Sequence, residues 1–227
     1  MIRVEFHAHT IYSKDSLTPP EDLIAAAKKR GIDRLIITEH NNIAGALAAQ
    51  AIDPDFVIVG EEVMTRQGEL LAAFVKEEVP PGLPAMEALQ RLRDQGAFIS
   101  VSHPFDVVRK GHWKLLDLLE IVPYVDAIET FNARCLWPGF NRQAQEFARQ
   151  HNLPGTAGSD AHTVYEIGRA TLLMPEFNDP DSLRAALPQA KRLGGLSNPF
   201  VHFASSYAKW YKRRQKKLTG QKSISQG

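Results

Sequence analysis

The sequence predicts an α/β fold built around a parallel β-sheet, and three observations support this prediction. Short apolar segments rich in β-branched residues alternate about seven times with segments of helical periodicity. The 227 residues suffice for one large α/β domain or two small ones. No internal repeat or clear linker interrupts the pattern before about residue 200. In such folds, functional side chains gather at the carboxyl ends of the strands.

Eight segments have the length and composition of strands. The first, Arg3–His7, lies in an apolar, β-branched stretch and leads into two histidines, His7 and His9. The others, in chain order, are Arg34–Thr38, Phe56–Glu61, Leu70–Val75, Ala97–Ser102, Ala127–Phe131, Gly155–Gly158 and Thr171–Met174.

Four segments between these strands carry helix signals. Residues 18–31 place Thr18 and Glu21 at capping-box spacing, with prolines suited to a first turn and Gly31 as the stop. Residues 84–96 are expected to bury Leu89 and Leu92, and Gly96 ends that helix. A shorter helix is expected over residues 114–122. Residues 138–152 predict a helix with one apolar side, formed by Phe140, Ala144, Phe147 and Ala148.

Composition excludes some classes of protein. No apolar run approaches the roughly 18 residues of a membrane span, and the N-terminus lacks the pattern of a signal peptide. We therefore expect no membrane partner. The single cysteine, Cys135, excludes an internal disulfide and favours the reducing cytoplasm.

Charge is distributed unevenly along the chain. Residues 182–227 contain ten Lys or Arg and no Asp or Glu, which leaves 17 basic and 26 acidic residues in residues 1–181. The segment YAKWYKRRQKK at 207–217 predicts a solvated helix or a contact with nucleic acid or another polyanion. We expect a domain of residues 1–200 and an aromatic and basic tail of residues 201–227, whose last ten residues are expected to be disordered. The tail aromatics could instead pack on the domain; they are Phe200, Phe203, Tyr207 and Trp210.

Five of the eight histidines fall just past predicted strands. His7 and His9 are two residues apart, so their side chains share one face of an extended strand. Asp160 and His162 form a second pair of this spacing, and His40 and His103 follow other strands. The histidines expected to have ordinary structural roles are His112, His151 and His202.

Imidazole and carboxylate side chains in this number have the chemistry of a transition-metal site. They suit Zn²⁺, Mn²⁺ or Fe, and they are too many for one tetrahedral ion. A lone histidine or aspartate is more often structural, so the prediction rests on their coincidence at strand ends. We therefore expect two or three divalent metal ions, with Glu62 able to bridge two of them.

Six motifs, in this order, resemble those of the PHP family, the polymerase and histidinol phosphatase domain: HAHTIYSKDS, TEHNN, GEE, SHP, ETFN and GSDAH. The resemblance covers roughly residues 1–175 and implies a distorted (βα)7 barrel, a trinuclear metal site and phosphoesterase activity. The ligand sets it implies are His7, His9, Glu62 and Asp160 for one ion, Asp15, His40 and His162 for a second, and Glu62, His103 and Cys135 for a third.

Some positions differ from the family pattern or leave alternatives open. Asp15 stands where some members have histidine, and Glu39 replaces the usual aspartate before His40. Glu39 is expected to orient an imidazole. Cys135 could be a metal ligand or a buried, inert thiol. Glu62 matches the motif better than Glu61, which is expected to face the core.

The implied reaction uses water bridged by the metal ions as the nucleophile, so it needs no serine or cysteine nucleophile. Arg134 and Arg169 are expected to bind the substrate phosphate, with a surface salt bridge as the alternative for either. Asn132 is expected either to bind the substrate or to fix its loop. Only residues 63–102 separate Glu62 from His103, so the lid is expected to be small and the site open to a small phosphorylated substrate.

Nucleotide and oligonucleotide phosphates are also compatible with such a site. Two other hypotheses remain open. The first is a metal-dependent hydrolase of an amide-type bond, and the second is a non-catalytic metal-binding or regulatory module.

Overall fold

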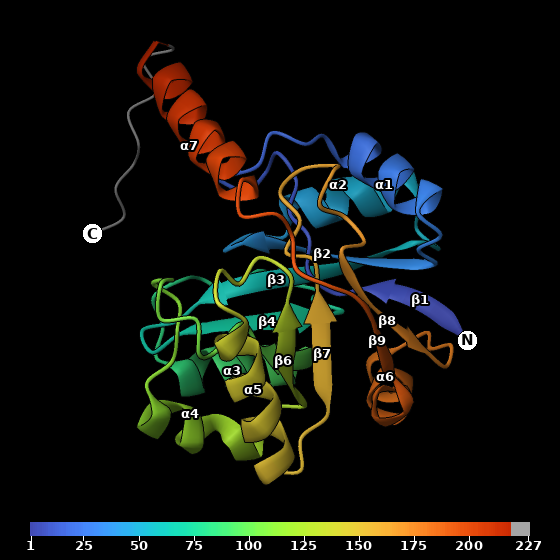
Figure 1. The fold of residues 1–227 in the computed structure, drawn as a ribbon, viewed down its shortest axis with the longest axis vertical. Helices are drawn as coiled ribbons and strands as arrows, with labels where there is room; N and C mark the ends of the chain where they lie inside the picture. Colours follow the sequence, from blue (N-terminus) through green and yellow to red (C-terminus); the bar gives the residue numbers. More distant parts are fainter. Residues whose placement is uncertain (219–227) are drawn as a thin grey trace.

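One nine-stranded sheet curves into a nearly closed barrel in the computed structural model, which describes residues 1–218 (Figure 1). The strand order is β7-β6-β5-β4-β3-β2-β1-β8-β9. The strands are β1 (Ile2–Glu5), β2 (Arg34–His40), β3 (Val57–Met64), β4 (Glu69–Ala73), β5 (Phe98–Val101), β6 (Ala127–Asn132), β7 (Gly155–Gly158), β8 (Ala170–Met174) and β9 (Lys191–Gly194). A parallel bridge between Ala8 and Ala161 joins the chain after β7 to the chain after β1. The α/β barrel predicted from the sequence is confirmed.

All eight predicted strands are present, and β9 is an additional one. The expectation of a wholly parallel sheet is wrong, because β4 runs antiparallel to both β3 and β5 and β8 runs antiparallel to β1 and β9. Only residues 65–68 connect β3 to β4. That connection is too short for the crossover that a parallel pair requires, so these strands form a hairpin.

Seven α-helices and two 3₁₀ turns connect the strands within residues 1–218. The α-helices are α1 (Pro20–Lys29), α2 (Ala44–Ile52), α3 (Ala85–Asp94), α4 (Leu115–Ile121), α5 (Pro138–Gln150), α6 (Pro180–Ala186) and α7 (Val201–Leu218). The 3₁₀ turns are η1 (Val122–Tyr124) and η2 (Leu187–Gln189). The four predicted helices correspond to α1, α3, α4 and α5.

The capping box predicted at Thr18 and Glu21 is wrong. Pro19 is the N-cap of α1 and makes no side-chain cap hydrogen bond. The Thr18 hydroxyl instead donates to the carbonyl of His162 at 3.1 Å. At the other end the prediction holds, because Gly31 follows α1 in the left-handed region with φ +67°.

Successive strand residues point to opposite faces of the sheet, so their side chains belong to two different apolar clusters. Ile36 and Ile58 are paired in register and belong to a cluster that includes Phe6 and Phe98, whose ring centroids are 6.3 Å apart. Leu35 and the paired Val57 belong to the other cluster, which packs against the helices. Leu89, Leu92, Ala144, Phe147 and Ala148 are buried in that second cluster as predicted. Burial on both faces fixes the register that positions the strand ends.

The C-terminal segment forms the helix α7, which projects from the barrel in Figure 1. The expectation that residues 218–227 are disordered lies outside the described residues, except that Leu218 ends α7. No helix within residues 1–218 is long and apolar enough to span a membrane.

Candidate metal centre

The predicted ligand residues converge at one end of the barrel. His7 and His9 follow β1, His40 ends β2, Glu62 lies in β3 and His103 follows β5. The three remaining members lie in loops after β1 and β7; they are Asp15, Asp160 and His162. All of these side chains are buried except that of His40, which is 11% exposed. The structure therefore brings these residues together at the ends of the strands, as the sequence predicted.

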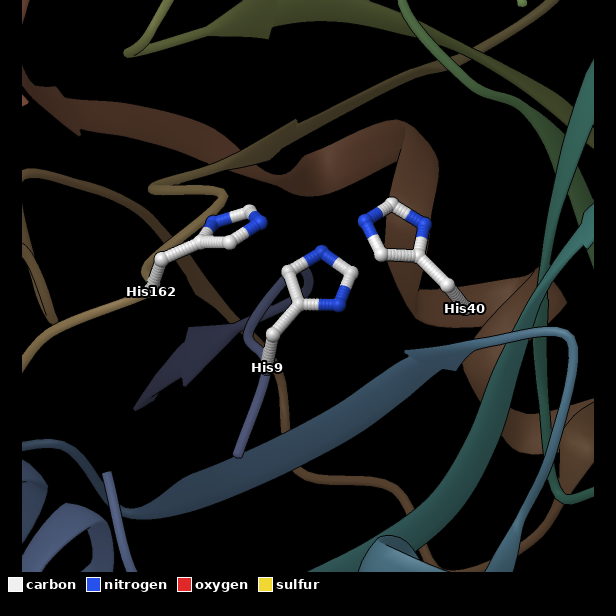
Figure 2. Close-up of side chains that lie close together, drawn as sticks. All are labelled: His9, His40 and His162. Atoms are coloured by element: carbon white, nitrogen blue, oxygen red, sulfur yellow. The ribbon is translucent and has the colours of Figure 1, made fainter. Parts of the chain in front are cut away.

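Three imidazole rings turn their nitrogens toward a common volume (Figure 2). The ring centroid of His9 lies 4.4 Å from that of His40 and 4.3 Å from that of His162. One nitrogen from each of these rings lies within 4.8 Å of the other two. One ligand atom from each of His7, His9 and Glu62 also lies within 4.8 Å of the other two. The same spacing holds among His40, Glu62 and Glu69.

Glu62 is the central carboxylate of the cluster. Its Oε1 lies 3.1 Å from His103 Nε2 and 3.4 Å from His7 Nε2. Its Oε2 lies 2.9 Å from His40 Nδ1 and 3.6 Å from His9 Nε2. Each oxygen of Glu62 therefore faces two ring nitrogens, as a bridging ligand would.

Asp15 and Asp160 extend the cluster on two sides. Asp15 Oδ1 lies 3.4 Å from His40 Nε2 and 3.3 Å from His162 Nε2. Asp160 Oδ1 lies 3.3 Å from His9 Nε2 and 3.4 Å from His162 Nδ1. Two ligands that each lie about 2.1 Å from one tetrahedral ion are separated by roughly 3.4 Å. These spacings match that value.

Several of these buried atoms have no hydrogen-bond partner within the described residues. They are His7 Nε2, His9 Nε2, Asp15 Oδ1, His40 Nδ1, Glu62 Oε2, His103 Nδ1 and Asp160 Oδ1. A buried polar atom without a partner destabilises a fold by about 1–3 kcal/mol. Divalent cations would satisfy the atoms that face the cluster, which excludes His103 Nδ1 because that ring faces Glu62 and Glu69 with Nε2, so the residues present fit the metal site that the sequence predicts.

The ionisation of the cluster is consistent with cation binding. Burial lowers the pKa of His9, and the rings of His162 and His40 lower it further, which leaves its ring nitrogen a lone-pair donor. Burial opposes ionisation of Glu62, yet His7 and His40 hold the pKa of this carboxyl well below its usual range. Against the effect of burial, Glu62 and Asp15 raise the pKa of His40 to about 10. A metal ion at His40 must therefore displace a proton.

Outer partners fix the orientation of two imidazoles. His7 Nδ1 lies 2.8 Å from Glu129 Oε1, and the other oxygen of Glu129 accepts from the backbone N–H of His103 at 2.8 Å. Ser13 Oγ contacts His9 Nδ1 at 3.2 Å and donates to Glu39. Glu39 thus acts on His9 through Ser13. Such contacts set the ring tautomer and direct the remaining nitrogen to the metal.

Two loop residues of the site have strained backbones. His103 and Asp160 have φ angles of +23° and +52°, in the region that favours glycine. Conformations of this kind persist where the surrounding structure enforces them, and they cluster at functional sites.

The structure adds Glu69 and Arg109 to the site. Glu69 Oε2 lies 3.5 Å from His103 Nε2, and the Arg109 guanidinium donates to Asp160 and to Asn132 Oδ1, the latter at 3.3 Å. The assumption of a parallel sheet concealed Glu69, because the amino end of the antiparallel β4 meets the same barrel end as the carboxyl end of β3. Arg109 lies in a loop with no periodic signal.

The predicted phosphate ligands occupy different positions. Asn132 is buried beside the cluster, where its amide donates to Asp160 Oδ2 at 3.1 Å. Arg134 is buried and donates to Glu166 Oε1 at 2.9 Å and to Ser205 Oγ at 2.8 Å. Arg169 is exposed and lies near Arg30, outside the residues that line the adjacent cavity.

Within residues 1–218, Cys135 is not part of any set of three His, Cys, Asp or Glu side chains whose ligand atoms lie within 4.8 Å of one another. Burial raises the pKa of its thiol, although the nearby Arg109 opposes this rise. Its assignment as a metal ligand stays a prediction.

A cavity of about 390 Å³ opens beside the cluster. Asp15, His40, Glu69 and His162 form its metal-binding side. The cations on its wall are Lys14, Arg109, Lys110, Arg134 and Lys209. His202 also lines this cavity, although the sequence suggested an ordinary structural role for it. Within residues 1–218, three of these cations are held by carboxylates, Arg109 by Asp160, Arg134 by Glu166 and Lys209 by Asp15.

Comparison with known proteins finds two family models that match the chain. A PHP domain matches residues 5–79 and a PHP-associated domain matches residues 138–191. An uncharacterized protein of Methanocaldococcus jannaschii, MJ0417, is 36% identical over 187 residues, which are 80% of this chain and 75% of that protein.

Solved structures share the fold. A two-domain protein from Bacteroides vulgatus, described as containing a predicted PHP-like metal-dependent phosphoesterase, superposes with a TM-score of 0.69 at 20% identity. The match covers 86% of this chain and only 65% of that one. An amidohydrolase from Chromobacterium violaceum superposes with a TM-score of 0.59 at 15% identity, over 83% of this chain and 97% of that one.

Proposed function

Because the chain belongs to the PHP family, we propose that it is a metal-dependent phosphoesterase that hydrolyses a phosphomonoester or a nucleotide or oligonucleotide phosphate. The observation that supports this proposal best is the set of six buried, unpartnered nitrogen and oxygen atoms that face the cluster, beside a cavity whose wall includes Lys14, Lys110 and Arg109. The unpartnered nitrogen and oxygen atoms suit divalent metal ions, and the cations on the cavity wall suit a phosphate anion.

The proposed ligand sets follow from the contacts. His7, His9, Glu62 and Asp160 are proposed to hold one ion, and Asp15, His40 and His162 a second. For a third ion we favour Glu62, His103 and Glu69, because Glu69 Oε2 lies 3.5 Å from His103 Nε2. Cys135 remains an alternative to Glu69. The metal could be Zn, Mn or Fe, because imidazole and carboxylate ligands suit all three.

The ions would supply Lewis acidity, since they lower the pKa of bound water and neutralise charge on phosphoryl oxygens. The residues of the chain do the rest. Arg109, held by Asp106 Oδ2 at 3.2 Å, can bind and orient the phosphate at the cavity wall. Ser102 Oγ donates to Glu62 Oε1 at 2.7 Å and fixes the central carboxylate. The buried ligand shell limits access of bulk water to the cluster.

Hydrolysis of an amide-type bond is the competing hypothesis, because clustered metal ions also polarise carbonyl groups. An amide substrate is usually neutral and would gain little from the cations on the cavity wall, of which Lys14 and Lys110 form no ion pair within residues 1–218. The cationic wall is therefore the feature that favours a phosphoester. The single cysteine of the chain keeps the cytoplasm as the proposed location.

The test is metal analysis of the full-length protein combined with a substrate panel. We expect two or three transition-metal ions per chain and release of p-nitrophenol from p-nitrophenyl phosphate with Mn²⁺, Zn²⁺ or Fe²⁺. Turnover of a p-nitroanilide amide without turnover of any phosphoester would refute the phosphoesterase. A reconstituted protein that holds less than one ion per chain would refute the metal centre.

A further inference from the structure

Helix α7 contacts the metal centre through one face only. Ser205 and Ala208 are buried on that face, and Ser205 accepts from Arg134 at 2.8 Å. Lys209 Nζ lies 3.2 Å from Asp15 Oδ2, and the Lys212 ammonium donates to the carbonyls of Ile11 and Ser13. Small and basic residues, rather than apolar ones, therefore attach this helix to the barrel.

The opposite face of α7 and the residue before it carry aromatic side chains that are largely exposed, although Tyr207 also lines a surface cavity with Leu17 and Pro19 of a barrel loop. Phe203 is 69% exposed, Tyr207 56% and Trp210 51%, and Phe200 is exposed as well. A surface helix usually buries its apolar stripe, so this arrangement is the reverse of the common one. The exposure of Phe203 and Trp210 argues against the sequence-based alternative in which the aromatics pack on the barrel, whereas Tyr207 lies partly against a barrel loop. A contiguous exposed stripe of this kind marks a binding surface.

The exposed rings lie close to one another along the helix. The centroids of Phe200 and Phe203 are 6.0 Å apart, and those of Tyr207 and Trp210 are 5.7 Å apart. The Arg214 guanidinium lies over the Trp210 ring at 5.4 Å from its centroid. The stripe therefore offers flat rings and a cation side by side.

Charge identifies the kind of partner. The last 46 residues of the chain carry ten Lys or Arg and no acidic residue. Arg213, Arg214 and Lys217 are exposed on α7 itself. A partner that matches this surface is polyanionic and carries planar rings. Single-stranded nucleic acid has both properties, since its bases stack on aromatic side chains and its phosphates pair with Lys and Arg.

The position of α7 connects this surface to the proposed catalytic cavity. His202, Ser205, Ser206 and Lys209 line the cavity from the same helix. The 18 residues of α7 span about 27 Å, the length of roughly eight stacked nucleotides at 3.4 Å each. A strand held along the outer face is separated from these cavity-lining residues by the width of the helix, about 10 Å, so it must cross the edge of α7 to bring a phosphate to the cavity mouth.

We infer that the aromatic and basic outer face of α7 is a docking surface for single-stranded nucleic acid, which presents an oligonucleotide phosphate to the metal centre. This inference rests on the proposed phosphoesterase function for the presentation step, but the binding step stands without it. A bilayer surface also attracts aromatic and basic side chains. The headgroup phosphates of a bilayer stay in the plane of its surface, whereas a single strand can bend to bring one phosphate to the cavity, so the structure favours the nucleic acid.

Fluorescence anisotropy with a 12-nucleotide single strand, as DNA and as RNA, tests the binding step on the full chain. Trp210→Ala and Tyr207→Ala should each weaken binding by about 5- to 100-fold, as expected for the loss of one stacked base. Tyr124→Ala is the matched control, because Tyr124 is an exposed aromatic residue in η1, outside α7. It should bind like the parent.

The salt dependence of binding tests the basic residues with a second variant, which leaves the aromatic rings unchanged. Replacing Arg213 and Lys217 by Gln should make the slope of log K against log[salt] shallower by about 1.4, since each single-strand phosphate contact contributes about 0.7. Arg149→Gln, an exposed cation on α5 paired with Glu146, should leave the slope unchanged.

Two assays separate this inference from the proposed function. If Trp210→Ala, Tyr207→Ala and Tyr124→Ala all bind the strand equally, or if only anionic phosphatidylserine vesicles bind in an α7-dependent manner, the docking surface is refuted. If the strand binds as expected but the parent hydrolyses no phosphoester, the docking surface stands and the proposed function fails. If both stand, Trp210→Ala should lower the ratio of oligonucleotide to p-nitrophenyl phosphate kcat/KM.

Discussion

Replacing Glu62 by Gln should weaken the binding of metal ions. Glu62 lies close enough to His7 and His9, and also to His40 and Glu69, to share a metal ion with either pair. Each of its oxygens faces two ring nitrogens at 2.9–3.6 Å. Glutamine keeps the size of the side chain but loses its charge and offers only one oxygen to a metal. The substitution should therefore weaken two sites, whereas Asp15→Asn should weaken one.

The magnitude follows from binding linkage. A ligand present at 100 times its Kd stabilises the folded state by about 2.7 kcal/mol. For a domain of about 200 residues, 1 kcal/mol moves the Tm by about 2–4 °C. Each metal site filled at that concentration should therefore raise the Tm by about 5–11 °C. Glu62→Gln should lose two such increments and Asp15→Asn one.

The assay is thermal unfolding of the metal-free protein titrated with Mn²⁺, together with metal analysis. His151→Ala controls for the removal of an imidazole, because His151 lies at the end of α5 against Phe147, outside the cluster. That variant should retain the full rise in Tm. If Glu62→Gln gains as much Tm from Mn²⁺ as the parent, Glu62 does not bridge metal ions and our assignment of the site is wrong.

Three further predictions concern residues around the cluster. Arg109→Lys should lower kcat/KM for p-nitrophenyl phosphate by about 10- to 100-fold, which steady-state kinetics would measure. Lysine lacks the planar guanidinium that can hold Asp160 and a phosphate at the same time. Glu166→Gln should lower the free energy of unfolding by about 3–5 kcal/mol in urea, because it leaves the Arg134 guanidinium buried without its charge partner at 2.9 Å. Lys209→Met should raise the KM for a phosphomonoester several-fold while the melting temperature stays close to that of the parent, since Lys209 is partly exposed; an unchanged KM would show that its ion pair with Asp15 is only structural.

Most of the barrel could be predicted from the sequence, because its strands are short apolar runs bounded by clear stops. The direction of β4 could not be predicted in this way. Hydropathy does not record strand direction, and only the short connection from β3 indicates a hairpin. This one error concealed Glu69, since a residue at the start of a parallel strand would lie at the opposite end of the barrel.

The sequence pattern also could not predict which face of α7 is buried against the barrel. The aromatic spacing predicts an apolar face, and the usual expectation is that such a face is buried. The structure buries Ser205 and Ala208 instead and directs Lys209 to Asp15. Long-range polar contacts of this kind have no periodic signature. For the same reason, the sequence did not show that Arg134 is held by Glu166 and Ser205.

The two closely spaced ligand pairs were predictable because they lie on the seam that closes the barrel. Ala8 separates His7 from His9, and Ala161 separates Asp160 from His162. The two alanines pair in a parallel bridge, with His9 N–H donating to the Ala161 carbonyl at 2.8 Å and Ala161 N–H donating to the His7 carbonyl at 3.2 Å. Both alanines are fully buried in the outer apolar cluster.

Alternation along an extended chain turns His7 and His9 toward the centre, whereas Asp160 reaches it from a left-handed backbone with φ +52°. A slip of one residue in this seam would turn the ligands outward and the alanines inward. Closure of the barrel thus also brings together the residues of the proposed metal centre. Cations that bind these four residues should favour the closed barrel over any open form in which the seam is unpaired.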